Sequence, residues 1–340
     1  KMRSKTELLH IASKMPKSEL HLHIEGTFEP EQMFQMAQRN HIPLKYDSVD
    51  ALKSAYQFDN LQSFLDLYYQ GMSVLQTQRD FYELTMAYLA KVHQQNVVHV
   101  EIFFDPQGHL ERGIAFETQI NGIHAALEDA RKEWGISFRL IMSFLRHLSQ
   151  DSAFNTLELA KPHLDKIDGV GLDSSELGHP PEKFAQVFAA CKALGLKITA
   201  HAGEEGPPDY VWQALDTLNV DRIDHGNRAL EDVHLVAEIN QRKLTLTVCP
   251  LSNLKLCVVD TMRQHPIQKM LQLGLNATVN SDDPAYFGGY MTENYHALIQ
   301  HSELTLAELK QLARNGFTGA WLSPEEQRNY LAQLEQHFID

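Results

Sequence analysis

The stretch SELHLHIEG, residues 18–26, alternates apolar and polar side chains along most of its length. Its apolar residues are interleaved with His21, His23 and Glu25, and a period of two is that of a β-strand. We therefore predict a strand over residues 19–25. In that strand His21 and His23 point to the same side, because they lie two residues apart. Two imidazoles on one strand face raise the question of what they bind.

Seven further segments rich in apolar, β-branched or aromatic residues follow, and longer amphipathic segments typical of helices separate them. The predicted strands after the first are 97–104, 138–145, 169–174, 197–202, 221–225, 244–249 and 276–281. Strands that alternate with helices at this spacing form parallel βαβ units. Eight such strands favour an α/β fold of the (β/α)8 TIM-barrel type. The main alternative, a doubly wound sheet, usually has five or six strands.

No linker, internal repeat or low-complexity segment divides the chain. We therefore expect residues 1–340 to form a single barrel domain. Extra helices are expected in an inserted region after the first strand, at about 27–96. A helical tail is expected after Asn294.

The composition excludes several classes of protein. Lys and Arg number 30 against 44 Asp and Glu, which gives a formal net charge of −14 and argues against nucleic acid as a partner. The three cysteines are widely spaced and form no C-x-x-C pair, so neither a disulfide framework nor a thiolate zinc site is indicated. No apolar run reaches the roughly 18 residues that a membrane span needs. We expect a cytoplasmic protein with no membrane partner, and the sequence leaves a homo-oligomer open.

Polar side chains with catalytic potential recur where the predicted strands end. They are His201 and Glu204 at the end of the fifth strand, Asp224 and His225 at the end of the sixth, and Asp282 and Asp283 at the end of the eighth. The carboxyl ends of barrel strands meet on one rim, where the active sites of such barrels lie. Three imidazoles and a carboxylate on that rim suit zinc or another divalent metal.

Each of these features has a structural explanation when it is taken alone. An H-x-H pair is more often a polar strand face than a metal site, and His201 is equally well explained as a hydrogen-bonded core residue. Asp282-Asp283-Pro284 resembles a turn or a helix cap. The joint pattern favours a site, because independent structural causes would have to place every group on the same rim.

Five motifs of the chain occur in the order in which one enzyme family carries them. They are PKSELHLHIEGT (16–27), HAGE (201–204), RIDHG (222–226), CPLSN (249–253) and NSDDP (280–284). In these motifs the chain resembles the adenosine/AMP deaminase family over most of its length. The other zinc deaminase class carries H-x-E with P-C-x-x-C and is excluded, because this chain has H-A-G-E and no C-x-x-C.

The resemblance implies one catalytic Zn²⁺ per chain, with Fe²⁺ as the alternative metal. Its ligands would be His21, His23, His201 and Asp282. A bound metal of this kind lowers the pKa of water from 15.7 to about 7 and so provides hydroxide at neutral pH.

The resemblance also implies the roles of three residues toward a small-molecule purine base. Glu204 would protonate a ring nitrogen, N1 of the purine, as water adds to C6. His225 would accept the proton of that water or hold the hydroxide toward the ring. Asp283 would hydrogen-bond N7 and orient the base.

Three departures from the pattern of adenosine-cleaving members resemble the branch that deaminates free adenine. They are Asp224 in RIDHG, Glu176 in GLDSSELGHPP (171–181), and the sequence NSDDPAYFGGY (280–290). We expect Glu176 to accept a hydrogen bond from the N9–H or N3 side of adenine and to crowd a ribose. The alternatives are that Glu176 faces solvent, that the substrate is adenosine or a modified adenine, or that the chain is a binding or signalling relative without activity.

The segment FDNLQSFLDLYY (58–69) places Phe58, Leu61, Leu65 and Tyr68 on one helical stripe. Such a stripe usually packs into a core. In the family that the chain resembles, the equivalent helix covers the active site. Core packing and a cover over the pocket are therefore both open.

Overall fold

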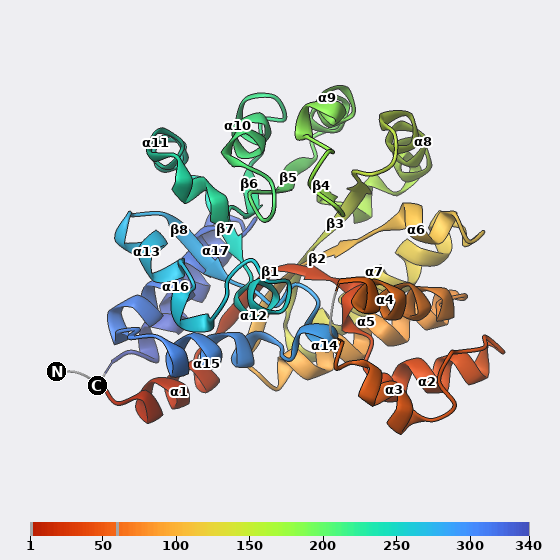
Figure 1. Cartoon of the computed structure of the whole chain (residues 1–340), viewed down its shortest axis with the longest axis horizontal. Coiled ribbons are helices and arrows are strands. Elements are labelled where there is room, and N and C mark those ends of the chain that lie inside the picture. Colours follow the sequence, from red (N-terminus) through yellow and green to blue (C-terminus); the bar gives the residue numbers. More distant parts are fainter. Residues whose placement is uncertain (1–2, 59–60, 340) are drawn as a thin grey trace.

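The computed structural model of the chain describes residues 3–58 and 61–339. Eight parallel strands are hydrogen-bonded in chain order, β1 to β8, and helices surround them (Figure 1). The strands are β1 (Lys17–His23), β2 (Val97–Phe104), β3 (Ser137–Leu145), β4 (Gly169–Asp173), β5 (Lys197–Ala202), β6 (Arg222–His225), β7 (Thr245–Val248) and β8 (Asn276–Val279). The predicted (β/α)8 barrel is confirmed.

The barrel closes where β1 meets the segment that follows β8. The His23 N–H donates to the Asp282 carbonyl at 3.0 Å, and the Asp282 N–H donates to the His21 carbonyl at 3.0 Å. The Leu20 N–H donates to the side-chain oxygen of Asn280 at 2.9 Å. The seam of the barrel therefore brings the two histidines of β1 next to the carboxylate that follows β8.

The region between β1 and β2 is helical, as the sequence predicted. Helix α1 (Lys5–Lys14) precedes β1, and β2 is reached through the 3-10 turn η1 (Ile24–Thr27), α2 (Pro30–Arg39), α3 (Val49–Ala55), α4 (Leu61–Val74) and α5 (Gln78–His93). Helix α5 begins with a capping box of Thr77 and Asp80, which pairs the free backbone N–H groups of its first turn.

The other helices lie between successive strands or after β8. Between strands lie α6 (Pro106–Leu110), α7 (Phe116–Trp134), α8 (Gln150–Ala160), η2 (Lys161–Lys166), η3 (Pro181–Phe184), α9 (Ala185–Ala193), α10 (Pro208–Asp216), η4 (Asn227–Glu231), α11 (Val233–Gln241), α12 (Pro250–Lys255), η5 (Met262–Gln264) and α13 (Ile267–Gln272). After β8 come α14 (Pro284–Phe287), α15 (Met291–His301), α16 (Leu306–Thr318) and α17 (Pro324–Gln336). None of the helices in residues 3–58 and 61–339 is long and apolar enough to cross a membrane.

The first strand ends earlier than the sequence pattern predicted. The alternation suggested a strand to Glu25, but β1 ends at His23 and Glu25 lies in the turn η1. The buried Glu25 carboxylate accepts the Asp105 N–H at 3.0 Å and pairs with His109 Nε2 at 2.8 Å. These bonds tie the turn to the segment after β2 and end the extended conformation.

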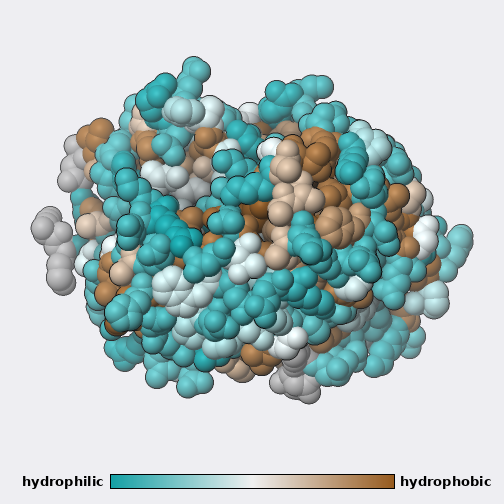
Figure 2. Space-filling view, turned by 90° about the horizontal axis from the view of Figure 1, so that it is seen from above, coloured by the Kyte–Doolittle hydropathy of each residue, from teal (hydrophilic) through white to brown (hydrophobic). Residues whose placement is uncertain are grey.

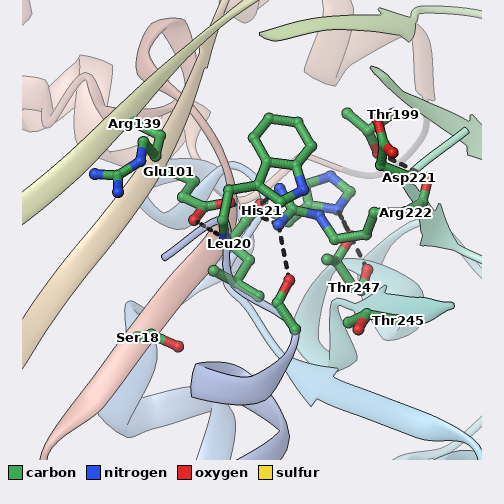
Figure 3. A network of polar contacts seen from close by, with 12 residues as sticks. Ser18, Leu20, His21, Glu101, Arg139, Thr199, Asp221, Arg222, Thr245 and Thr247 are labelled. Atoms are coloured by element: carbon green, nitrogen blue, oxygen red, sulfur yellow. Dashed lines mark hydrogen bonds and ion pairs between the residues drawn. The ribbon is translucent and has the colours of Figure 1, made fainter. Parts of the chain in front are cut away.

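A polar network fills the barrel interior toward the amino-terminal ends of the strands (Figure 3). The buried Arg222 donates to Glu101 Oε1 at 2.6 Å, and its guanidinium lies 4.3 Å from the centroid of the Trp321 ring. Glu101 Oε2 pairs with His99 Nε2 at 2.7 Å and accepts the Trp321 N–H at 2.7 Å. The buried positive charge of Arg222 is therefore paired with the negative charge of Glu101 inside the core. Such pairing is needed because an unpaired buried charge is strongly destabilising.

The outer surface of the molecule is also largely polar (Figure 2). Seen from above, most of the molecular face is hydrophilic, and hydrophobic side chains appear in several places, with the widest stretch right of the centre (Figure 2). Such a surface agrees with the formal net charge of −14.

Candidate active site

The four residues predicted as metal ligands meet at the carboxyl rim of the barrel. His21 and His23 come from β1, His201 from β5, and Asp282 from the segment after β8, and all four are buried. One potential ligand atom from each lies within 4.8 Å of all the others. The structure therefore brings together residues that are up to 261 positions apart in the sequence, as the barrel topology predicted.

The spacing of these atoms fits the ligands of a single metal ion. His23 Nε2 lies 3.2 Å from His201 Nε2 and 3.2 Å from Asp282 Oδ1, and His21 Nε2 lies 3.4 Å from Asp282 Oδ1. Zinc–ligand bonds of about 2.0–2.1 Å place the atoms of neighbouring ligands roughly 3 Å apart. In the described part of the chain the buried His21 Nε2 has no hydrogen-bond partner, which also fits an atom that serves as a ligand.

The opposite ring nitrogen of each of these histidines faces an oxygen. His21 Nδ1 lies 3.0 Å from Thr247 Oγ1, His23 Nδ1 lies 3.3 Å from Asp173 Oδ2, and His201 Nδ1 lies 3.3 Å from Asp224 Oδ2. An oxygen at Nδ1 fixes the tautomer and turns Nε2 toward the shared position, as in known metal centres. The rings are therefore oriented for metal binding by groups outside the ligand set.

Asp224 supports two of these rings. The buried carboxylate faces His201 directly, and its Oδ1 accepts a hydrogen bond from Thr247 Oγ1 at 2.8 Å, the hydroxyl that contacts His21. Burial alone would raise the pKa of Asp224, but the hydrogen bond and charge of His201 hold it below the ordinary value. Asp224, which the sequence offered as a mark of substrate preference, contacts the metal-site histidines.

A second set of residues, His21, His225, Cys249 and Asp282, also lies within ligand distance. Its thiol is a poor ligand, because burial and the charge of Asp282 raise the pKa of Cys249 well above that of an ordinary thiol. The Cys249 S–H donates instead to the Thr247 carbonyl at 3.7 Å. The set with three histidines and Asp282 is therefore the better metal site.

Glu204 and His225 lie side by side next to this cluster. Glu204 Oε2 is 3.3 Å from His225 Nε2, and His225 Nε2 is 3.8 Å from Asp282 Oδ2. Burial raises the pKa of Glu204 well above its ordinary range, and the carboxylates of Asp282 and Glu176 raise it further. Burial and the neighbouring His21 lower the pKa of His225 well below its usual value. These shifts favour the protonated carboxylic acid at Glu204, which can donate a proton, and the neutral imidazole at His225, which can accept one.

The backbone at the rim is strained where these side chains are presented. His225 has a φ of 73° and Asp282 a φ of 64°, in the left-handed region that favours glycine. Gly26 makes room for the neighbouring Asp283, because a Cβ at position 26 would stand 2.0 Å from Asp283 Oδ1. Strain of this kind is concentrated at functional sites, where the surrounding structure holds it in place.

A cavity of about 540 Å³ opens above the cluster. His23, His201, Glu204, His225, Asp282 and Asp283 all line it. Leu65 and Tyr68 of α4 line its wall, together with Phe64, Tyr69 and Met72. Both explanations for the stripe in 58–69 hold in part, because Leu65 and Tyr68 line the pocket and, together with Phe58, also pack against the hydrophobic core. Residues 59 and 60 and the side chain of Leu61 lie outside the described part.

Glu176 has different partners from those that the sequence suggested. It is 2% exposed, and its two carboxylate oxygens accept hydrogen bonds from the four backbone N–H groups of residues 203–206. A carboxylate has about four lone-pair sites, and four donors occupy them. This corrects both expectations for Glu176, because its side chain is directed neither at a purine nor at solvent. The neighbouring Ser174 and Ser175 line the cavity instead.

Two acidic residues near the metal cluster were missed by the sequence reasoning. Asp173 ends β4 and Asp105 follows β2, and both lie within ligand distance of His23. Their signal was the same strand-end position that identified the other groups. The contact of Thr247 with His21 carried no such signal, since a threonine within a strand is an ordinary β-former.

A barrel with this arrangement on its carboxyl rim belongs to the class of metal-dependent hydrolases. Comparison with protein families identifies one family within this class, because the family model described as adenosine deaminase matches residues 16–337. The chain belongs to the adenosine deaminase family. The resemblance in the five sequence motifs is thereby confirmed.

Individual relatives cover nearly the whole chain. An adenine deaminase of Marinomonas sp. (strain MWYL1) is 70% identical over 331 residues, which are 97% of this chain and 99% of that protein. The crystal structure of an adenine deaminase from Arthrobacter aurescens has a TM-score of 0.92 and 46% identity, and the match covers 95% of this chain and 98% of that one. An amidohydrolase from Burkholderia ambifaria with bound Zn has a TM-score of 0.89 and 29% identity, over 99% of this chain and 94% of that one.

Proposed function

We propose that this chain hydrolyses adenine to hypoxanthine and ammonia, with one Zn²⁺ held by His21, His23, His201 and Asp282. The observation that carries the proposal is the pairing of Glu204 with His225, 3.3 Å apart, on the wall of the cavity that the metal cluster also lines. The names of the relatives from Marinomonas and Arthrobacter support adenine as the substrate. The zinc described for the Burkholderia protein supports the choice of metal over Fe²⁺.

The residues divide the chemistry between them. A metal held by the cluster would lower the pKa of water to about 7 and so make hydroxide available as the nucleophile at neutral pH. Glu204 holds its proton because of burial and the nearby carboxylates, and it gives that proton to N1 of the ring as C6 is attacked. His225, kept neutral by burial, accepts the proton that the water releases. Asp283 lines the same cavity and hydrogen-bonds N7.

The groups act together because addition of water to an aromatic ring has two requirements. The attacked carbon needs a nucleophile on one side, and the adjacent ring nitrogen needs a proton so that negative charge does not accumulate there. The 6-amino group then receives the proton that His225 accepted and leaves as ammonia. The added hydroxyl returns a proton to Glu204, and the product is a 6-oxopurine. Helix α4 forms part of the cavity wall and limits the access of bulk water to this exchange.

The experiment is ammonia release by purified protein of known metal content, with adenine and adenosine as alternative substrates. We expect ammonia and hypoxanthine from adenine, a much lower kcat/KM for adenosine, and loss of activity when a chelator removes the metal. Adenosine as the better substrate would contradict the assignment of adenine. A folded, metal-loaded protein that releases no ammonia from either compound would contradict deamination. Location in the cytoplasm and self-association remain predictions from the sequence.

A further inference from the structure

The turn that carries Glu204 donates all of its backbone N–H groups to one side chain. The N–H of Gly203 donates to Glu176 Oε2 at 2.8 Å. The N–H groups of Glu204, Glu205 and Gly206 donate to Oε1 at 3.2, 2.9 and 2.8 Å. Consecutive N–H groups that converge in this way form a concave anion site, and here the anion belongs to the protein itself.

The turn is shaped around that carboxylate. A Cβ at Gly206 would stand 2.6 Å from Glu176 Oε2, and Gly203 has a φ of 79°. Glycine at these two positions therefore lets the backbone approach the carboxylate and reverse direction beside it. The fit indicates that the sequence of the turn and the side chain of Glu176 depend on each other.

The carbonyl groups of the same turn are held from the other side. The Arg228 N–H donates to the Gly203 carbonyl at 2.8 Å, and Arg228 Nη1 donates to the Glu205 carbonyl at 2.6 Å. Arg146 Nη1 donates to the His201 carbonyl at 2.7 Å, where the turn begins. Glu204 thus stands on a turn whose N–H groups are all bound by Glu176 and whose flanking carbonyls are bound by two arginines.

We propose that Glu176 is a positioning residue for catalysis, whose carboxylate fixes the 203–206 turn and thereby holds the Glu204 carboxyl beside His225. The inference rests on the proposed role of Glu204 as the proton donor. The distance of 3.3 Å between Glu204 Oε2 and His225 Nε2 is the geometry that the turn maintains. The negative charge of Glu176 also favours the protonated form of Glu204, since it adds to the effect of burial and raises the pKa of Glu204.

The first test is the Glu176→Gln variant, assayed for kcat, KM and metal content. Glutamine keeps the volume, but its NH₂ group must face at least one N–H group of the turn. Because a displacement of about 1 Å can cost about 10²-fold in rate, we expect kcat for adenine to fall by about that factor. KM and metal content should stay near those of the wild type. A raised KM with unchanged kcat would overturn the proposal and favour direct contact with the substrate.

The matched control is Glu101→Gln, which removes a buried carboxylate in the network at the amino-terminal ends of the strands. This variant should lose stability and keep the kcat of its folded fraction. An equal fall in kcat for both variants would show that general destabilisation explains the effect, and it would overturn the specific role of Glu176.

The second test is a double-mutant cycle with Glu204→Gln. If Glu176 acts through Glu204, Glu176→Gln should reduce kcat by about 10²-fold in the wild type and have little further effect once Glu204 is replaced. Additive losses would overturn the proposal. If Glu204→Gln alone leaves the rate unchanged, the proposed function of Glu204 fails, and this outcome is distinct from additivity.

Gly206→Ala disturbs the contact between Glu176 and the turn from the side of the turn, and it leaves the carboxyl groups of Glu176 and Glu204 unchanged. Its Cβ would displace Glu176 Oε2 and Tyr210 Cδ2, each 2.6 Å away. We expect a fall in kcat with unchanged metal content, as for Glu176→Gln. This variant also decides the question if Glu176→Gln does not fold: a folded Gly206→Ala protein with the kcat of the wild type would contradict the proposal.

Discussion

The two ends of the barrel both bury charged side chains, but they differ in how those side chains are paired. Toward the amino-terminal ends of the strands, the charges of Arg222 and Glu101 meet each other at 2.6 Å. At the carboxyl rim, the buried His21 Nε2, both ring nitrogens of His225 and Asp283 Oδ1 make no hydrogen bond among the described residues. Burial alone therefore does not mark a site. A single buried polar atom without a partner does not mark one either, since Arg222 Nε also makes no hydrogen bond among the described residues. Several such atoms gathered beside one cavity indicate where a ligand is received.

The same contrast is visible in Glu101 and Glu204, two glutamates with opposite pKa shifts. Arg222 and His99 overcome the effect of burial at Glu101 and lower its pKa to about 2. Burial and the carboxylates of Asp282 and Glu176 raise the pKa of Glu204 well above its ordinary range. One glutamate is kept ionised and stabilises the fold, while the other is kept protonated and available for proton transfer.

Removal of a metal ligand should have the largest effect on activity and so tests this difference most directly. His21→Ala deletes one of the four converging atoms, so the protein should fold, lose its bound metal and lose its deaminase activity. Metal content by plasma mass spectrometry and ammonia release measure both effects. His99→Ala, at the paired end, is the matched control and should retain the metal. A His21→Ala protein with full metal content and activity would contradict the ligand assignment.

Replacement of the proton donor should have the next largest effect on activity. Glu204→Gln should keep the metal and reduce kcat by about 10²–10⁴-fold, because general acid catalysis contributes that much. Glu205→Gln, which changes the exposed neighbouring side chain, should reduce the rate far less. Equal rates for Glu204→Gln and the wild type at several pH values would exclude Glu204 as the acid.

Asp224 tests whether the groups that orient the ligands matter. Its carboxylate faces His201 Nδ1 and binds the hydroxyl that contacts His21. Asp224→Asn should weaken metal binding by about 10- to 100-fold, which competition with a chelator measures. The control is Asp221→Asn, because Asp221 lies just before the same strand and accepts the Ile198 N–H instead. Unchanged metal affinity in Asp224→Asn would show that the other contacts suffice to hold the rings.

The strands and the convergence of the four candidate metal ligands could be predicted from the sequence because both follow short-range rules. Alternation over 19–25 indicated a strand that projects His21 and His23 together, and the ends of parallel strands meet on one rim of a barrel. These two rules brought His201 and Asp282 to the same place without knowledge of the contacts between them.

Side-chain partners across loops could not be predicted in this way. Glu176 and residues 203–206 are brought together by the path of two separate loops, and a glutamate in a loop carries no mark of what it will bind. The sequence suggested that Glu176 binds the purine, and the structure shows that it accepts hydrogen bonds from the backbone N–H groups of residues 203–206. Asp105 and Asp173 were within reach of the strand-end rule, whereas the contact between Thr247 and His21 depends on the tilt of neighbouring strands.

The smallest effect on catalysis is expected at the paired end, where the effect on stability is largest. The pKa of Glu101 is about 2 in the folded protein, against an ordinary value of 4.5. Its ionised form therefore stabilises the fold fully above pH 4.5, and this contribution is lost as the pH falls toward 2. The shift corresponds to about 3 kcal/mol at neutral pH.

Glu101→Gln removes that titration. Urea unfolding at pH 7, 5, 4 and 3 should show a lower free energy of unfolding at pH 7 and a weaker decline toward acid than in the wild type. The metal content and the kcat of the folded protein should stay unchanged, because the network near Arg222 contributes no residue to the cavity wall among the described residues. If the free energy of unfolding falls with the same slope in both proteins as the pH is lowered, Glu101 is not the cause of the pH dependence of stability. If kcat falls as well, the two ends of the barrel are coupled, and the separation between a paired structural end and an unpaired catalytic end does not hold.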